Sequence, residues 1–328
     1  MVAEPQRWLV TGGAGFIGSH LVEALLGAGR CVRVLDNFAT ARRETLERLV
    51  RPEWRARFAL VEGDVRDEAT CRACCDGMDV VLHQAALGSV PRSLRDPRAT
   101  HAVNVDGFVH VALAARDAGV RALVYASSSS VYGDATALPQ REAHLGRPLS
   151  PYAASKRAME IYAQVYHRSF GLPTIGLRYF NVVGRRQDPE GPYAAVVPRF
   201  IAALLRGEAP VIYGDGATSR DFCPVANVVQ ANLAAAAAPE AAVGQIFNIA
   251  LGRSTTLLEL FAMLRDIAVR HGVPCAGIEP RFTDFRPGDL RHSRASIAAA
   301  TERLGYAPAT TLEDALEDAV RHALATSG

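Results

Sequence analysis

A tyrosine and a lysine stand four residues apart in the stretch YAASK, at Tyr152 and Lys156. Residues one turn apart on a helix share a face, so the two side chains can act together. A buried ammonium beside a phenol stabilises the phenolate and lowers its pKa, which makes the tyrosine a general base near neutral pH. Such pairs also occur on ordinary amphipathic helices, so the pair alone is a weak indication of chemistry.

Four consecutive serines, Ser127 to Ser130, precede that pair along the chain. They directly follow an apolar run at 122–126 that predicts a strand. Serine runs are often flexible loops, but the carboxyl ends of strands in open α/β sheets are where ligands bind. A serine hydroxyl at that edge could connect Tyr152 to a substrate hydroxyl.

A glycine cluster near the N-terminus, GGAGFIG at 12–18, follows a predicted strand and opens a predicted helix. It fits GxGxxG through Gly13, Gly15 and Gly18, and GxxGxxG when Gly12 replaces Gly13. Without side chains the backbone can turn tightly and approach a pyrophosphate, which the free N–H groups of the helix N-terminus attract. A glycine cluster alone can also be a simple tight turn, so its neighbours decide the interpretation.

Asp36, at the end of the second predicted strand, makes the dinucleotide interpretation more specific. A carboxylate there accepts hydrogen bonds from a ribose diol and repels a 2′-phosphate, which favours NAD over NADP. Arg42 and Arg43 follow closely and leave NADP as the alternative. Asp64, just after the third predicted strand, is placed either to contact the adenine or to cap the helix predicted at 67–75.

Strand and helix patterns alternate along the first half of the chain, which predicts βαβ units and a parallel sheet. We expect strands at 8–11, 31–35, 58–61, 79–83, 122–126 and 174–178, and helices at 16–26, 98–117 and 151–170. Glycine and proline are more evenly scattered later, among strands at 211–213 and 245–249 and helices at 194–205, 256–269 and 312–325. The sequence predicts an α/β fold, in which a Rossmann-type doubly wound parallel sheet in residues 1–180 receives later segments from about 222–250. A smaller α/β lobe in residues 181–328 interleaves with it.

The composition excludes several classes of protein. The chain has 328 residues, 49% hydrophobic and 21% charged, which fits a globular protein and not a disordered one. A net charge of +2 argues against a broad basic face for nucleic acid. No apolar run is long enough to span a bilayer, and no secretory signal is visible, so we expect a soluble, cytoplasmic protein without membrane partners.

The six cysteines lack the paired CxxC spacing of zinc sites. Cys71, Cys74 and Cys75 can share one helical face, yet free cysteines are mostly small buried apolar residues. We therefore predict reduced cysteines and no metal site, with a metal or redox cluster as the lesser alternative.

Seven motifs, in this order, resemble those of the extended short-chain dehydrogenase/reductase family over almost the whole chain. They are TGGAGFIG at 11–18, HQAALGSVPRS at 83–93, SSSSVYGD at 127–134, SPYAASK at 150–156, LRYFNVVGRRQDP at 177–189, YGDGATSRDF at 213–222 and DFRPGDLRHS at 284–293. Within that family the chain is most similar to the nucleotide-sugar 4-epimerases, specifically the bacterial UDP-N-acetylglucosamine 4-epimerases. The resemblance implies an isomerase with tightly bound NAD that inverts the sugar 4-hydroxyl of a UDP-sugar through a transient 4-keto sugar.

The resemblance also implies residue roles. Tyr152 would be the catalytic base, Lys156 would lower its pKa and hold the nicotinamide ribose, and Ser128 would assist at the sugar 4-hydroxyl. Asn104 would steady the tyrosine and lysine from the cofactor side. The implied cofactor contacts are Gly12, Gly15, Phe16, Ile17, Gly18, Asp36, Asn37, Asp64, Val65, Gln84, Ala85, Ala86, Asn104, Tyr152, Lys156 and Tyr179. The implied substrate contacts are Gly88, Ser89, Ser128, Ser129, Ser130, Asn181, Gln187, Ala195, Val196, Tyr213, Arg220, Arg286, Asp289 and Ser293. Among these, Asn181, Arg220, Arg286 and Asp289 would hold the UDP moiety, and Tyr213 would pack near the uracil.

The size of the sugar pocket depends, by this resemblance, on Ser293. A bulky aromatic residue there would exclude an N-acetyl group, whereas a serine leaves room. Gly88 and Ser89 add space and a hydroxyl, and Gln187 and Ala195 match the pattern of the acetamido-sugar enzymes. We therefore expect interconversion of UDP-N-acetylglucosamine and UDP-N-acetylgalactosamine.

Other functions remain as alternatives. UDP-glucose and UDP-galactose are weaker candidate substrates, and UDP-uronic acids are a further possibility because Arg92 or His292 could pair with a C6 carboxylate. Related dehydratases and decarboxylases carry an acidic residue beside the active-site serine or threonine, where this chain has Ser129 and Ser130, which disfavours both. A non-enzymatic NAD-binding scaffold commonly lacks the tyrosine or the lysine, and this chain has both.

The helices predicted at 98–117 and 151–170 are long and amphipathic. In this family such a pair forms a four-helix homodimer interface, so the resemblance implies a homodimer. The alternative is that they only cover the sheet. The same resemblance implies a role in supplying UDP-N-acetylgalactosamine for surface polysaccharide biosynthesis.

Overall fold

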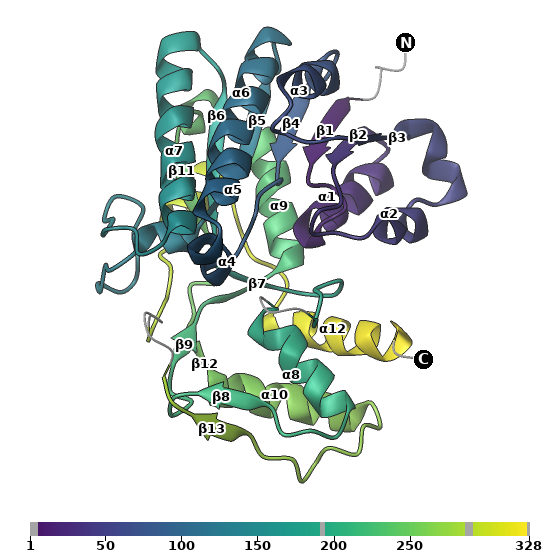
Figure 1. Cartoon of the computed structure of the whole chain (residues 1–328), viewed down its shortest axis with the longest axis vertical. Helices are drawn as coiled ribbons and strands as arrows, with labels where there is room; N and C mark the ends of the chain where they lie inside the picture. The colour runs from purple at the N-terminus through teal and green to yellow at the C-terminus, as the bar shows by residue number, and fades with distance from the viewer. Residues whose placement is uncertain (1–5, 191–193, 286–290, 327–328) are drawn as a thin grey trace.

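A seven-stranded parallel sheet forms the centre of the larger lobe (Figure 1). The computed structural model describes residues 6–190, 194–285 and 291–326. The strands are β1 (Arg7–Thr11), β2 (Cys31–Asp36), β3 (Phe58–Glu62), β4 (Val80–His83), β5 (Ala122–Ser128), β6 (Thr174–Tyr179) and β11 (Ile246–Ile249). They lie in the order β11-β6-β5-β4-β1-β2-β3, and every neighbouring pair is parallel. The order reverses between β1 and β4, so the predicted doubly wound Rossmann-type α/β fold is confirmed.

Helices cover both faces of the sheet, and this explains why its central strands are apolar along their whole length. All residues of β4 and β6 are buried. One face packs against α1 (Phe16–Gly27) and α9 (Val225–Ala236), and the other against α3 (Glu68–Cys75), α6 (Gly107–Asp117) and α7 (Pro151–Phe170). The shorter α2 (Arg43–Leu49) and the 3₁₀ helix η1 (Pro52–Arg57) connect β2 to β3, and η3 (Ser129–Tyr132) follows β5.

The smaller lobe lies at the carboxyl edge of the sheet, in the lower part of Figure 1. Its core joins α8 (Val196–Leu205), α10 (Leu257–Arg270) and α12 (Leu312–Thr326). Short strand pairs complete it: β8 (Val211–Tyr213) with β13 (Arg281–Thr283), and β9 (Ser219–Arg220) with β12 (Thr255–Thr256). Between the lobes, β7 (Asn181–Val183) pairs with β10 (Phe222–Pro224), and α11 (Ala298–Leu304) returns to pack on α9 and β11.

The chain leaves the sheet after β6 and returns to it for α9 and β11. Because β11 pairs with β6, the edge of the sheet is made from two segments that the smaller lobe separates in sequence. The predicted domain boundary near residue 180 stays a prediction.

The segment 98–117 differs from the single helix that the sequence predicts. It consists of α5 (Pro97–His101), a π-helical turn η2 (Ala102–Asp106) and α6. It follows the short helix α4 (Val90–Arg95). The π turn contains Asn104, whose buried side chain bonds to a loop and to a second helix. Local widening of a helix re-aims such a side chain, and π turns are frequent at functional sites.

Cys71, Cys74 and Cys75 lie on the face of α3 that packs against α6. Burial raises the pKa of the Cys71 and Cys75 thiols to about 12, so these thiols form part of the core and are poor nucleophiles. Within the described ranges, no three side chains of the metal-ligating types gather into a possible metal site. No described helix has the length and apolar character needed to cross a membrane.

Candidate active site

A cavity of about 660 Å³ runs along the carboxyl edge of the sheet, from the glycine cluster to Ser127 and Ser128 at the end of β5. Every predicted cofactor residue except Asn104 lines it. The sequence patterns did not predict several further lining residues, among them Arg66, Leu87, Ala99, Val103, Phe180 and Val182. Of these, Arg66 could have been found from its spacing, because it follows Asp64 by two residues and donates two side-chain hydrogen bonds to it.

The glycine cluster forms the turn from β1 into α1 as its pattern predicts. Gly12 has a φ of +67°, and a Cβ there would lie 2.7 Å from the backbone nitrogen of Ala85, so only glycine fits. A Cβ on Gly18 would overlap the carbonyl oxygen of Gly12, which shows how closely α1 packs on the loop. No side chain caps the N-terminus of α1 and its first turn has no acidic residue, so its N–H groups can bind an anion.

Asp36 holds this loop and also faces the cavity. One carboxylate oxygen accepts from the Ala14 N–H at 2.9 Å and the other from the Phe38 N–H at 2.9 Å. Each oxygen keeps a second lone pair for a ribose hydroxyl. Arg42 lies 3.9 Å from the carboxylates of Asp188 and Glu190, and this pairing gives no support to the NADP alternative.

Arg43, the other basic residue that left NADP open, pairs with Glu62 and stacks over the Phe38 ring. Asp64 lines the cavity and accepts a hydrogen bond from Asn37 at 2.7 Å. It does not cap α3, because the N-cap is Asp67, which accepts from the Ala69 N–H. The helix-cap interpretation of Asp64 is therefore wrong.

Tyr152, Lys156 and Ser128 meet at the inner end of the cavity. Ser150 caps α7 and accepts from the Ala153 N–H, so Tyr152 lies in the first turn and Lys156 one turn later. Ser128 ends β5 and hydrogen-bonds the Tyr152 phenol. Lys156 is 2% exposed, and its ammonium donates to the carbonyl oxygen of Ala126 at 2.8 Å.

The pKa values of this cluster differ from the expectation in one respect. Burial raises the pKa of Tyr152, and the hydrogen bond with Ser128 opposes that effect only in part. Burial lowers the pKa of Lys156 to about 7, and the nearby Glu160 opposes it. In the protein alone, the predicted lowering of the Tyr152 pKa by Lys156 is therefore wrong, because desolvation of the phenol dominates.

Asn104 does not line the cavity but supports residues that do. Its side-chain oxygen accepts from the Leu87 N–H at 2.8 Å, and its amide donates to the Leu87 carbonyl at 3.2 Å. The same amide donates to Ser155 at 3.0 Å, and Ser155 donates to the Tyr152 carbonyl at 2.8 Å. The π turn thus connects the loop after β4 to the first turn of α7.

A second cavity, of about 430 Å³, lies beside the first and shares Val182 with it. It contains the predicted substrate residues Asn181, Ala195, Val196, Tyr213 and Arg220. The sequence patterns did not predict other lining residues, which include Arg199, Thr218, Leu257, Phe285 and Arg291. Its described lining has three arginines and no carboxylate, and the Arg291 guanidinium lies 4.2 Å from the centre of the Phe285 ring. This composition suits a diphosphate beside an aromatic base.

The remaining predicted substrate residues divide into three groups. Gly88 and Ser128 line the first cavity. Ser89, Ser129, Ser130, Gln187 and Ser293 are not among the lining residues of either cavity. Ser89 caps α4, Gln187 donates to the Val182 carbonyl, and the buried Oγ atoms of Ser130 and Ser293 have no hydrogen-bond partner in the described chain. Arg286 and Asp289 lie outside the described residues.

Comparison with known proteins identifies the family to which these cavities belong. A model of the NAD dependent epimerase/dehydratase family matches residues 8–250. The chain belongs to this family. Its resemblance to the extended short-chain dehydrogenases/reductases is thereby confirmed.

Relatives of this epimerase/dehydratase chain match it over nearly its full length. The UDP-glucose 4-epimerase of Mycolicibacterium smegmatis is 40% identical over 316 residues, which cover 96% of this chain and 97% of the relative. A UDP-N-acetylglucosamine 4-epimerase from Methanobrevibacter ruminantium, solved with UDP-N-acetylmuramic acid, superposes with a TM-score of 0.90 at 36% identity and covers 98% and 99% of the two chains. The NAD complex of the Thermus thermophilus UDP-glucose 4-epimerase superposes with a TM-score of 0.84 at 35% identity. The match covers 98% of this chain and 100% of that one.

The cofactor of this epimerase/dehydratase family is NAD, and the residues of the first cavity fit it. The uncapped helix N-terminus at the glycine loop suits the pyrophosphate, and Asp36 suits the adenosine ribose. Lys156 and Tyr152 stand at the other end, where the nicotinamide ribose would lie. When bound, NAD⁺ supplies a hydride acceptor and a positive charge at that end.

Proposed function

We propose that this protein is a UDP-sugar 4-epimerase that interconverts UDP-N-acetylglucosamine and UDP-N-acetylgalactosamine. The observation that carries the proposal is that Ser128 and Tyr152 line the same dinucleotide cavity, and that an arginine-lined cavity meets this cavity at Val182. A sugar whose diphosphate lies in the second cavity can present its hydroxyl to this pair. The curated and solved relatives named above support a UDP-sugar as the substrate.

The chain's own residues account for the proton transfers. Tyr152 takes the proton of the sugar 4-hydroxyl, with Ser128 bridging the two oxygens, as hydride leaves C4 and a 4-keto sugar forms. Arg220 and the other arginines of the second cavity keep the UDP bound while the keto sugar turns. Tyr152 then returns its proton to the oxygen after the opposite face has been reduced, so the sequence has no net oxidation.

A base of this kind needs a lower pKa than burial gives Tyr152. Two positive charges at the same end of the cavity can provide it: the Lys156 ammonium and the nicotinamide ring. The proposal therefore requires Lys156 to be protonated in the working enzyme, although its own burial opposes this. The non-enzymatic alternative has no use for such a buried cation.

Small residues support an acetamido sugar as the substrate. Gly88 lines the first cavity, and a Cβ placed on it would meet open space, so the pocket has room at this point. Ser293 is buried and small, and its hydroxyl has no partner within the described chain, so no bulky side chain occupies this position. By resemblance, we also propose that the product supplies surface polysaccharide biosynthesis.

UDP-glucose and UDP-uronic acids are the runner-up substrates. The UDP-glucose 4-epimerases among the relatives favour the first. For the second, Arg92 and His292 are the cations that could meet a carboxylate, but neither is among the residues that line the two described cavities. His292 instead lies 2.9 Å from the Ser219 hydroxyl.

A panel of UDP-sugars separated by chromatography tests the proposal. We expect the highest kcat/KM with UDP-N-acetylglucosamine, and Ser293→Tyr should lower it for the acetamido sugar while retaining turnover of UDP-glucose. A wild-type preference for UDP-glucose would contradict the acetamido assignment. Absence of turnover with every UDP-sugar would contradict the epimerase assignment itself.

We further propose a homodimer through α6 and α7. Ile161, Tyr162 and Val165 form an apolar stripe on α7 that the described part of the chain leaves exposed. Two copies of the helix pair would bury the stripe in a four-helix interface. Sedimentation at micromolar concentration tests this: we expect a dimer, and Ile161→Glu should yield monomers.

A further inference from the structure

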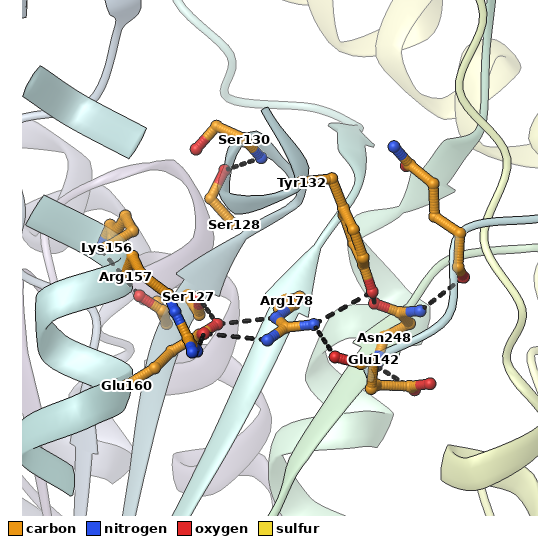
Figure 2. Close-up of polar contacts among 12 residues, drawn as sticks. Ser127, Ser128, Ser130, Tyr132, Glu142, Lys156, Arg157, Glu160, Arg178 and Asn248 are labelled. Carbon is orange, nitrogen blue, oxygen red and sulfur yellow. Dashed lines mark hydrogen bonds and ion pairs between the residues drawn. The ribbon is translucent and has the colours of Figure 1, made fainter. Parts of the chain in front are cut away.

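A buried ion pair lies behind the catalytic residues, between α7 and β6 (Figure 2). Glu160 is fully buried and Arg178 is 2% exposed. Arg178 donates to both carboxylate oxygens of Glu160, through Nε at 2.7 Å and Nη2 at 2.9 Å. Burial of two charges is costly, so a bidentate pair at this depth calls for an explanation beyond stability.

The Glu160 carboxylate also joins the two elements that carry the reactive groups. Ser127, which precedes Ser128 on β5, donates to it at 2.6 Å, and Arg157 donates to it at 2.9 Å. Together with the two nitrogens of Arg178, these groups make four donor atoms on one carboxylate, as Figure 2 shows. Glu160 therefore fixes the end of β5 against α7, which is where Ser128 meets Tyr152.

Lys156 and Glu160 are one helical turn apart on α7, and both are buried. Glu160 is the negative group that acts on the Lys156 ammonium and raises its pKa against the effect of burial. Because the charge of Lys156 is needed to stabilise a Tyr152 phenolate, Glu160 acts on the reaction through its neighbour and touches no reacting atom.

The surrounding groups do not replace this charge. His83 on β4 is buried, and its pKa is lowered to about 3 by burial and by Lys156, so it is neutral at working pH. Burial keeps Tyr125 on β5 and Tyr132 on η3 protonated by raising their pKa values. The other charged groups at this network are the cations Arg157 on α7 and Arg178 on β6, and the carboxylate of Glu142. Glu142 accepts from the Asn248 N–H at 2.9 Å and acts on Tyr132, whereas the charge that raises the pKa of Lys156 is that of Glu160.

From this geometry we propose that Glu160 is a positioning residue for the epimerase reaction. Glu160 holds the end of β5 in place against α7 and keeps the Lys156 ammonium charged. Arg178 makes the burial of the Glu160 carboxylate possible. This inference rests on the proposed function for the identity of the reaction, but not for the electrostatic effect on Lys156 and Tyr152.

Four variants separate the electrostatic role from a structural one. Glu160→Gln removes the charge but leaves Arg178 buried and unpaired, and this variant can fail to fold. The double variant Glu160→Gln/Arg178→Gln removes both charges and keeps two amides that can bond each other. Arg178→Gln alone retains the charge near Lys156. Tyr132→Phe is the matched control, since it breaks a bond of Arg178 in the same network without changing a charge.

The pH profile of kcat is the first measurement. The rate falls on the alkaline side as Lys156 loses its proton, so a lower Lys156 pKa moves this fall to lower pH. We expect the shift in the double variant and not in Arg178→Gln or Tyr132→Phe. On that limb the rate falls about tenfold for each unit of the shift. A folded double variant with the wild-type profile would overturn the proposal.

The second measurement does not depend on turnover. Lys156 is the only lysine in the sequence, so the side-chain resonance of protein labelled with ¹³C-lysine follows its titration directly. We expect its midpoint at lower pH in the double variant than in Arg178→Gln, and equal midpoints would overturn the proposal. If the wild type epimerises no UDP-sugar, the proposed function fails, whereas this titration still decides the role of Glu160.

Discussion

Asn104 and Ser155 are 51 residues apart in the sequence, yet the amide of Asn104 donates a hydrogen bond to the Ser155 hydroxyl at 3.0 Å. Ser155 in turn donates to the carbonyl of Tyr152, so a π-helical turn supports the first turn of the catalytic helix. The support also reaches Leu87, in the loop that lines the cofactor cavity. The two parts of the active site therefore share one buried amide.

Replacement of Asn104 by alanine should destabilise the protein and reduce turnover together. The variant leaves the partly buried Leu87 N–H without its acceptor, which should lower the free energy of unfolding by about 1 kcal/mol. Urea titration measures this loss. Ser155→Ala removes only the Ser155 partner of the Asn104 amide, so the free energy of unfolding should fall by less than in Asn104→Ala. Equal stability of Asn104→Ala and the wild type would contradict the role assigned to the π turn.

Replacement of Tyr152 by phenylalanine should remove the proton acceptor and little else. We expect kcat to fall about 10²–10⁴-fold, with the NAD content and the melting temperature retained. Tyr162→Phe, on the exposed side of the same helix, is the control and should leave kcat unchanged. Turnover of Tyr152→Phe at the wild-type rate would rule out this tyrosine as the base.

Asp36→Asn should weaken NAD binding. The carboxylate accepts from two backbone N–H groups, and an amide can accept only with its one oxygen. Hydrogen bonds to charged groups contribute about 1.5–3 kcal/mol, so the Kd for NAD should rise about 10–100-fold, and the preference over NADP should narrow. Calorimetry on cofactor-free protein measures both constants, with the exposed Asp117→Asn as control. An unchanged Kd would place the ribose elsewhere.

Arg220→Ala should raise the KM for the UDP-sugar and change kcat little. Arg220 lines the second cavity, where a diphosphate would accept charge-assisted hydrogen bonds. Loss of one such contact corresponds to about a 10–100-fold rise in KM. Arg206→Ala, an exposed arginine paired with Glu208, is the control. A large fall in kcat with KM unchanged would mean that Arg220 acts on the chemistry and not on binding.

Acid should destabilise the protein through His83. Its pKa is lowered from 6.5 to about 3, so below pH 6.5 the unfolded chain binds a proton that the folded protein does not. Stability is therefore lost as the pH falls from 6.5 towards 3, by about 2 kcal/mol at pH 5. His83→Gln should flatten this dependence in melting curves, whereas the exposed His144→Gln should not. Parallel curves for wild type and His83→Gln would contradict the assignment.

The sequence predicted correctly those elements whose ends are set by neighbouring residues, such as helix caps and tight turns. Helix α7 begins and ends as predicted because Ser150 caps it, Pro151 occupies its first turn and Gly171 ends it with a φ of +68°. The glycine loop and Asp36 were found in the same way, since their spacing follows from the turn that they make. The parallel pairing of the main strands followed from their alternation with helices, whereas their order came from the structure.

Long-range contacts explain what the sequence could not predict. The π turn at Asn104 depends on Leu87 and Ser155, which no local pattern connects. The raised pKa of Tyr152 depends on burial, which a motif does not reveal. Arg199 and Arg291 reach the second cavity from segments far apart in the chain. The charge of Arg178 inside an apolar strand was a signal that a buried partner exists, but only the fold identifies it as Glu160.

Strand β11 also bears on the synthesis of the chain. Its residues, Ile246–Ile249, pair with β6 only after the ribosome has produced the segment between them, which includes α8, β8, β9 and α9. Until then β6 is an unpaired edge, and an exposed strand edge invites pairing with other chains. Truncations that stop short of β11 should therefore aggregate, and the sheet should close late in translation.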